Sequence, residues 1–179
     1  MRPDLSTLER EFAPLLEVHA VELVALEWFQ GPGHGILRVT IDLPNGDPRV
    51  QDPGRSVGIA EIASVTRDIS AHLDTLDETV EPITLAYTLE VGSPGSERPV
   101  QKRADFDRFA GLEARIDTRG GLPGAPHKSF LGLLRGTCDA PASEGGFRVR
   151  VDVGGAVHEV PASELTRART VAIKPPAKA

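Results

Sequence analysis

The hydrophobic positions in the first half of the chain switch between helical and extended spacing. Apolar residues recur every three to four positions in 4–19 and again in 56–73, so both segments are predicted to be amphipathic helices. Between them, 21–29 is apolar on both faces and 36–43 alternates strictly, which predicts two strands joined as a hairpin by a glycine-rich turn. A further alternating run predicts a strand at 83–91. The predicted order is therefore α-β-β-α-β.

Strict alternation indicates a sheet with one face under the helices and the other face exposed to solvent or to a partner. Ser6 and Glu9 have the spacing of a capping box, which predicts the start of the first helix. Pro14 lies inside that helix and is expected to kink it. The segment 44–55 is rich in proline and glycine and is predicted to be a long polar loop.

Short strands with glycine-rich turns dominate the second half. After a helical turn at 102–111, five strands are predicted, at 112–118, 129–136, 147–153, 156–161 and 169–173. Regular short strands of this kind are typical of a small SH3-like or OB-like barrel. The last residues, 174–179, form a polar tail that is expected to be disordered.

A proline-glycine corner separates the two patterns. Pro94 and Gly95, which follow Ser93, suit the central positions of a type II turn, because glycine tolerates a positive φ. Pro99 favours an extended conformation at Arg98.

The sequence therefore predicts an α+β protein with four parts. These are an N-terminal domain at 1–92, a junction at 93–101, a C-terminal barrel at 102–173 and a tail at 174–179.

The charge changes sign at the same corner. Residues 1–92 hold 6 Lys/Arg and 16 Asp/Glu, a net charge of −10, whereas residues 93–179 hold 14 and 10, a net charge of +4. An acidic half repels nucleic acid and attracts basic proteins, while a basic half suits contact with phosphate. Two halves of opposite charge predict two kinds of partner.

Cofactor and catalytic motifs are lacking. Cys138 is the single cysteine, and the histidines are scattered without metal-ligand spacing, so no metal or cofactor is expected. No apolar run is long enough for a signal peptide or a membrane span, which predicts a soluble, cytoplasmic protein and, in our interpretation, a monomer. Ser93 follows a strand, but no nucleophile-elbow motif surrounds it, so a turn role is favoured over a catalytic one.

Candidate contact residues follow from charge and position. Asp42 and Asp47 lie in the acidic half, where they suit a basic protein partner. In the other half, two pairs of arginines each share one side of a segment; they are Arg148 with Arg150, and Arg167 with Arg169. If their strands are neighbours, the four guanidiniums form a strip that contacts phosphate. The few aromatic residues resemble core, which argues against base stacking.

The motifs around the junction resemble the bacterial ribosome maturation factor P family. The resemblance is carried by Ser93, Pro94, Gly95, Glu97, Arg98 and Pro99 after a Y-x-L-E-V strand, by Arg108-Phe109-Ala110-Gly111, and by Ile41-Asp42 with Gly46. It implies an α/β N-terminal domain and an SH3-like C-terminal barrel. It also implies a non-enzymatic factor that binds the immature small (30S) ribosomal subunit near the central pseudoknot of its RNA and ribosomal protein twelve. The junction residues Ser93 to Gly95, Glu97 and Arg98 are then candidate contacts.

Three functions remain open from the sequence. The first is an assembly factor that holds a basic ribosomal protein and neighbouring ribosomal RNA together. The second is a general RNA-binding module that uses the barrel, which predicts a steep salt dependence. The third is a small hydrolase that uses Ser93 and a distant histidine.

Overall fold

The computed structural model describes residues 3–44, 57–76, 86–95, 97–122, 127–143 and 146–171. The chain contains helices and two separate sheets, so the predicted α+β class is confirmed. It divides into two compact units, with Pro94 in the first and Gly95 in the second.

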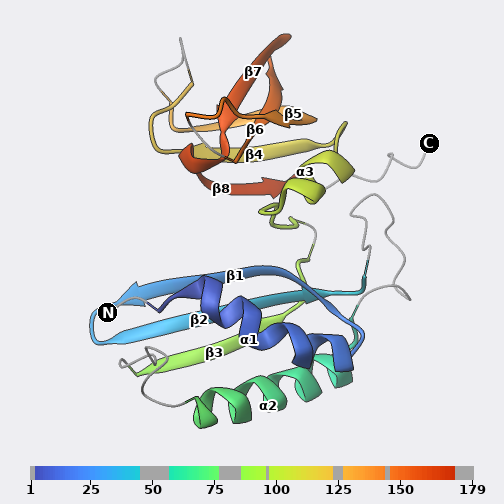
Figure 1. The fold of residues 1–179 in the computed structure, drawn as a ribbon, viewed down its shortest axis with the longest axis vertical. Helices are drawn as coiled ribbons and strands as arrows, with labels where there is room; N and C mark the ends of the chain where they lie inside the picture. Colours follow the sequence, from blue (N-terminus) through green and yellow to red (C-terminus); the bar gives the residue numbers. More distant parts are fainter. Residues whose placement is uncertain are drawn as a thin grey trace, which may run out of the picture. The chain divides into compact units, whose positions relative to one another are not determined.

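The first unit has the predicted element order, α-β-β-α-β (Figure 1). Its elements are α1 (Leu5–Val18), β1 (Glu22–Gly31), β2 (His34–Asp42), α2 (Ile59–Thr75) and β3 (Tyr87–Gly92). The part of the third predicted strand that precedes Ala86, and the loop 44–55 beyond its first residue, lie outside the described residues.

The three strands form a sheet in the order β1-β2-β3, with β1 and β2 antiparallel and β2 and β3 parallel. Leu37, Val39 and Ile41 project from one face of β2 and are fully buried. The helices cover this face, because Phe12 of α1 and Ile69 of α2 belong to the same hydrophobic core. The predicted covered face is thus present.

The β1–β2 hairpin is longer than the sequence indicated. Gly31 pairs with His34, so the turn is confined to Pro32 and Gly33, and Gly33 has a φ of 73°. The next glycine, Gly35, lies against the Trp28 indole. A Cβ at Gly35 would come 2.1 Å from the Trp28 ring, so only glycine fits.

Asp4, rather than the predicted capping box, begins α1. Its carboxylate accepts hydrogen bonds from the Ser6 hydroxyl at 2.7 Å, from the Thr7 hydroxyl at 2.8 Å and from the backbone N–H of Ser6 at 3.0 Å. These bonds hold the pKa of Asp4 down at about 2, because they favour the charged form. The predicted Ser6–Glu9 capping box was therefore wrong, because the N-cap is Asp4, two positions before Ser6.

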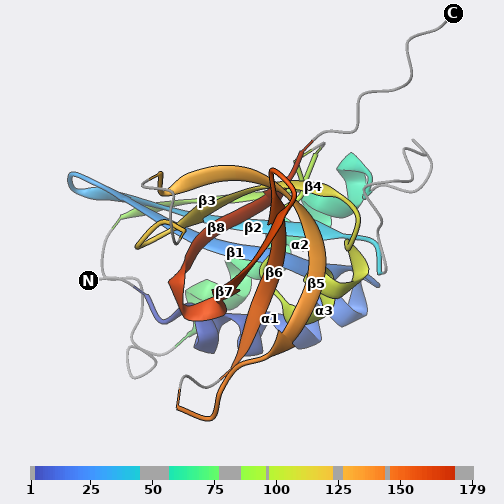
Figure 2. The same ribbon diagram turned by 90° about the horizontal axis from the view of Figure 1, so that it is seen from above.

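The second unit contains one short helix and a five-stranded antiparallel sheet in the order β7-β6-β5-β4-β8. The elements are α3 (Arg103–Arg108), β4 (Glu113–Thr118), β5 (Ser129–Asp139), β6 (Phe147–Val153), β7 (Ala156–Pro161), the 3-10 turn η2 (Ala162–Glu164) and β8 (Leu165–Thr170). Figure 2 shows these strands strongly curved. The last strand begins four residues earlier than predicted and ends at Thr170, because its pairing with β4 runs from Leu165 opposite Thr118 to Thr170 opposite Ala114.

The core of this unit joins α3 to the sheet. Its buried side chains include Phe106, Phe109, Ile116, Leu134, Val149 and Val151. Among the described residues, β7 and β8 stand at the two ends of the strand order and do not pair with each other, so the expected closed SH3-like barrel stays a prediction.

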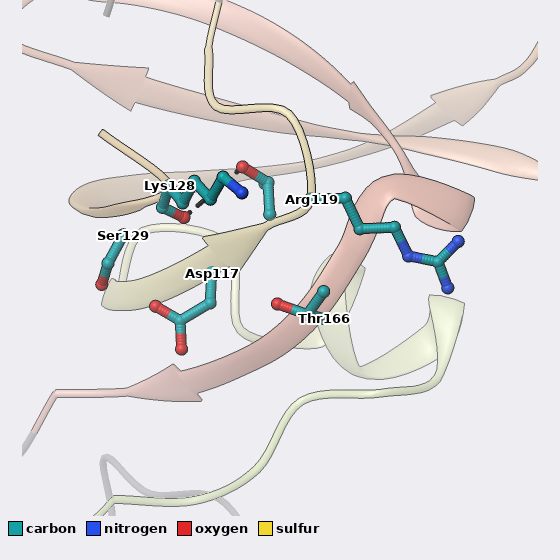
Figure 3. Close-up of a pocket in the computed structure, with 6 residues that line it drawn as sticks. Asp117, Arg119, Lys128, Ser129 and Thr166 are labelled. Carbon is teal, nitrogen blue, oxygen red and sulfur yellow. Dashed lines mark hydrogen bonds between the residues drawn. The ribbon is translucent and has the colours of Figure 1, made fainter. Parts of the chain in front are cut away.

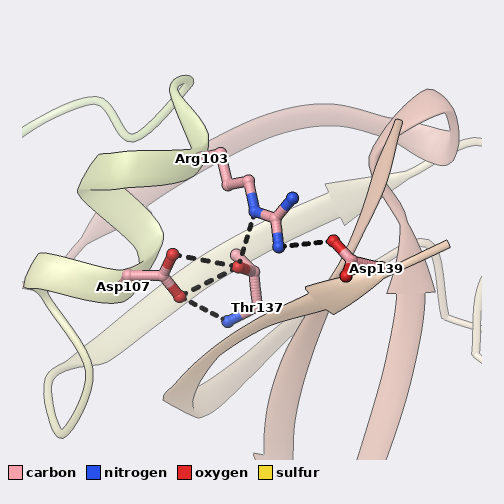
Figure 4. A network of polar contacts seen from close by, with 4 residues as sticks. All are labelled: Arg103, Asp107, Thr137 and Asp139. Carbon is pink, nitrogen blue, oxygen red and sulfur yellow. Dashed lines mark hydrogen bonds and ion pairs between the residues drawn. The ribbon is translucent and has the colours of Figure 1, made fainter.

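A polar network also ties α3 to β5 (Figure 4). Asp107 accepts from the Thr137 backbone N–H at 2.7 Å and from its hydroxyl at 2.9 Å. Arg103 donates to the same hydroxyl at 3.2 Å and pairs with Asp139 at 2.8 Å. The network sits where the β5–β6 register shifts, and so fixes the helix on the irregular part of the strand.

Candidate functional site: a basic surface on β4 and β8

The second half of the predicted junction pairs with β8. The Thr170 N–H donates to the Arg98 carbonyl at 2.9 Å, and the Val100 N–H donates to the Ala168 carbonyl at 2.9 Å. Pro99 forms an isolated bridge with Arg169 between these two bonds. Residues 98–100 are therefore held along β8 by one isolated bridge and the two hydrogen bonds that flank it.

The junction motif, through Arg98, and the motif at 108–111, through Arg108, both contact the ring of Phe109. The Arg98 guanidinium lies 5.6 Å from the centre of the Phe109 ring, and the Arg108 guanidinium lies 4.7 Å from it. Phe109 is fully buried and Arg98 is 2% exposed. Guanidiniums over an aromatic face are attracted by its quadrupole. Arg98 is therefore a packed structural residue, with little surface left for a partner.

The other candidate residues near the corner are distributed as follows. Ser93 and Gly95 are exposed and Pro94 is partly exposed, and Gly95 has the positive φ expected there, 64°. No hydrogen bond joins Ser93 to a histidine within the described residues. Asp42 is 8% exposed and accepts from the Leu43 N–H at 2.9 Å, which leaves little carboxylate for a partner. Asp47 lies outside the described residues.

The structure does not bring the four predicted arginines onto neighbouring strands. β6, which carries Arg148 and Arg150, is separated from β8 by β5 and β4. Arg148 pairs with Glu159 at 3.5 Å, and Arg150 is exposed on the same side of β6. The condition for the four-guanidinium strip is therefore not met.

Arg167 and Arg169 instead meet β4. Arg169 lies opposite Arg115, and Arg167 lies opposite Asp117. Together with Glu97, these residues line an open hollow of about 130 Å³. We call this set, Glu97, Arg115, Asp117, Arg167 and Arg169, the β4/β8 surface.

A second hollow of about 470 Å³ adjoins this surface and shares Asp117 with it. Its other lining residues are Thr118, Arg119, Lys128, Ser129 and Thr166. Figure 3 shows Asp117, Ser129 and Thr166 gathered on one side, with the Thr166 hydroxyl toward Asp117, whereas the Arg119 guanidinium points away from them. The backbone fixes this end of β4, because the Thr118 N–H donates to the Lys128 carbonyl at 2.8 Å and the Arg119 N–H to the Glu164 carbonyl at 2.9 Å.

Cations outnumber carboxylates along these two hollows. Arg115, Arg119, Lys128, Arg167 and Arg169 stand against Glu97 and Asp117. Guanidiniums spaced on one sheet face suit the oxygens of a phosphate chain. Sequence reasoning identified Arg167 and Arg169 but missed Arg115, Arg119 and Lys128. Arg115 lies between the buried Ala114 and Ile116, so the alternation predicts that its side chain faces outward. The alternation does not predict the strand order, which places Arg115 beside Arg169.

Other chemistry finds little support in the described part of the chain. No group of three histidine, cysteine or acidic side chains there could hold a metal ion. Burial, followed by the charge of Glu159, raises the pKa of the Cys138 thiol, so this thiol is not activated as a nucleophile. None of the described helices is long and apolar enough to cross a membrane.

Comparison with protein families gives a match in the first unit and the corner that follows it. Residues 11–97 match the family model described as the RimP N-terminal domain. The match spans most of α1, the whole three-stranded sheet, α2 and the Pro94–Gly95 corner. It supports a role in ribosome maturation. The match confirms the family predicted from the sequence and supports the assignment of the chain to the ribosome maturation factor P family.

Proposed function

We propose that this protein is a non-enzymatic assembly factor that binds the immature small ribosomal subunit in the cytoplasm and promotes its maturation. The family match supports a ribosome maturation role, and the family suggests the small subunit as the partner. In this proposal the second unit is an SH3-like barrel whose strands carry the RNA-contacting arginines.

The observation that carries the proposal is the division of charge between two units. The acidic half has a net charge of −10 and the basic half a net charge of +4. In the basic half, the register places Arg115 beside Arg169 on one sheet face. On a particle where a basic protein lies next to RNA, the protein attracts the acidic half and the RNA phosphates attract the basic half. RNA alone would be repelled by the acidic half.

We assign the two halves to different partners. The acidic unit contacts a basic ribosomal protein, for which ribosomal protein twelve of the small subunit is the candidate. The β4/β8 surface contacts the phosphates of neighbouring small-subunit ribosomal RNA. To promote maturation, the factor must bind one state of the particle more tightly than another, because a ligand with equal affinity for both states shifts nothing.

Co-sedimentation tests this function. The purified protein is mixed with immature small subunits, mature small subunits, large subunits and deproteinised small-subunit RNA at physiological salt. We expect the largest bound fraction with immature small subunits. Equal binding to all four would contradict the proposal.

The alternative is a general RNA-binding module, which the cations of the β4/β8 surface favour. It predicts that naked RNA competes as well as particles do, with an affinity that falls steeply as salt rises. The same experiment separates the two, because an assembly factor prefers the immature particle over its deproteinised RNA.

A further inference from the structure

Asp117 occupies a position that a simple phosphate site does not explain. The strand register puts Ser129, Asp117 and Arg167 in one row across β5, β4 and β8, and puts Arg115 and Arg169 in the next row. Asp117 lines both hollows. A carboxylate here repels the phosphate that the arginines attract.

The Asp117 carboxylate makes no hydrogen bond or ion pair with any other residue that the structure describes, although Arg167 lies opposite it. An ionised carboxylate only accepts hydrogen bonds. A ligand that fits this site therefore needs anionic oxygens for the arginines and a hydrogen-bond donor for Asp117.

We propose that the β4/β8 surface and the adjoining hollow bind the RNA backbone through phosphate and ribose together, with Asp117 accepting a hydrogen bond from a ribose 2′-hydroxyl. This inference deepens the proposed function, on which it rests. Arg115, Arg167 and Arg169 hold the phosphates, and the hydroxyls of Ser129 and Thr166 line the sugar side of the same hollow. The 2′-hydroxyl is the group that lets a protein distinguish RNA from DNA at a given site.

Spacing along the strands is compatible with this division. Arg115 and Asp117 are two residues apart on the same face of β4, or about 6.8 Å. Arg167 and Arg169 repeat this spacing on β8, on the same face. An RNA backbone, in which phosphate and ribose alternate, can thus place a phosphate against one row of side chains and a ribose against the next. Base stacking is not required, because the lining residues of both hollows include no aromatic ring.

Binding of matched single strands tests the inference. Fluorescence anisotropy is measured with a labelled RNA 12-mer and with DNA of the same sequence, under identical salt. We expect the unaltered protein to prefer RNA roughly tenfold, which corresponds to about 1.4 kcal/mol. Asp117→Ala should bring this ratio close to one, by weakening RNA binding and leaving or raising DNA binding. Asp117→Asn, which keeps the shape, should reduce the ratio in the same direction.

Glu113→Ala is the matched control, because Glu113 is exposed on the same face of β4 but lines neither hollow. It should leave the RNA preference unchanged. Arg115→Glu should weaken RNA and DNA alike, since it removes a phosphate contact. Far-UV circular dichroism of each variant checks that the second unit remains folded.

Equal affinity of the unaltered protein for RNA and DNA would overturn the inference, as would an RNA preference that survives Asp117→Ala. If neither strand binds while the protein still co-sediments with immature small subunits, the β4/β8 surface contacts protein instead. That result overturns the ribose assignment but leaves the small-subunit role in place. Loss of co-sedimentation with retained RNA preference would instead reject the proposed function alone.

Discussion

Replacing Phe109 with alanine should strongly destabilise the second unit while leaving the stability of the first one unchanged. Phe109 is fully buried, and the guanidiniums of Arg98 and Arg108 lie over its ring at 5.6 and 4.7 Å. Truncation of a buried phenylalanine costs about 3–5 kcal/mol. The lost cation–π contacts contribute about 0.5–2 kcal/mol each to this total, with the upper end for desolvated pairs. Since small domains are stable by only about 5–15 kcal/mol, this is a large share.

The chain allows each unit to be followed separately. Trp28 and Tyr87 are the single tryptophan and the single tyrosine, and both lie in the first unit. Their fluorescence during urea unfolding therefore reports the first unit, whereas far-UV circular dichroism reports both. For Phe109→Ala we expect an unchanged fluorescence midpoint and a circular dichroism curve with an added transition at lower urea.

Phe109→Leu is the matched control, because it keeps an apolar side chain but removes the aromatic face. It should produce a smaller shift in the same circular dichroism transition. An equal fall of the fluorescence midpoint in Phe109→Ala would refute the reasoning, since the two units would then share one cooperative core. An unchanged circular dichroism curve would show that Phe109 does not hold the second unit together.

Three further predictions concern other parts of the chain. Gly35→Ala should destabilise the first unit by about 1–3 kcal/mol in urea unfolding followed by fluorescence, because the new Cβ would meet the Trp28 ring. Asp4→Ala should lower the melting temperature at pH 7. This deficit should shrink as the pH falls from about 4 to 2 and disappear below about 2, since the carboxylate with a pKa of about 2 loses its capping charge there. Arg115→Glu should weaken co-sedimentation with immature small subunits and flatten its salt dependence, whereas Arg150→Glu, two strands away on β6, should change it much less.

Each of these predictions has a clear contrary result. Wild-type stability in Gly35→Ala would mean that the indole can move aside at no cost. A melting-temperature deficit in Asp4→Ala that is as large at pH 2 as at pH 7 would rule out capping by the charged carboxylate. Equal loss of particle binding in the Arg115 and Arg150 variants would point to overall charge rather than to the β4/β8 surface.

Local patterning was enough to predict the elements of both units, because each strand and helix here buries one face. The alternation of Leu37, Val39 and Ile41 identified the covered face of β2, which the structure shows fully buried. Element ends were less predictable. Asp4 caps α1 in place of Ser6, and β8 begins at Leu165 rather than at residue 169. These ends depend on hydrogen bonds between residues that periodicity does not distinguish.

The candidate site was harder to predict than the fold, because it depends on strand order. The outward positions of Arg167 and Arg169 could be read from the sequence, but their neighbour on β4 could not. Arg98 shows the opposite case. Its place in the junction motif made it a candidate contact residue, whereas the structure packs it over Phe109. A charged motif residue can thus be structural when an aromatic face receives it.

The affinity ratio between immature and mature small subunits tests the central claim most directly. Quantitative co-sedimentation of the full chain with each particle, over a range of protein concentrations at physiological salt, gives the two dissociation constants. The account predicts that the protein binds the immature particle at least about tenfold more tightly, a difference of about 1.4 kcal/mol. Equal dissociation constants for the two particles would contradict it, because the protein could then favour neither state.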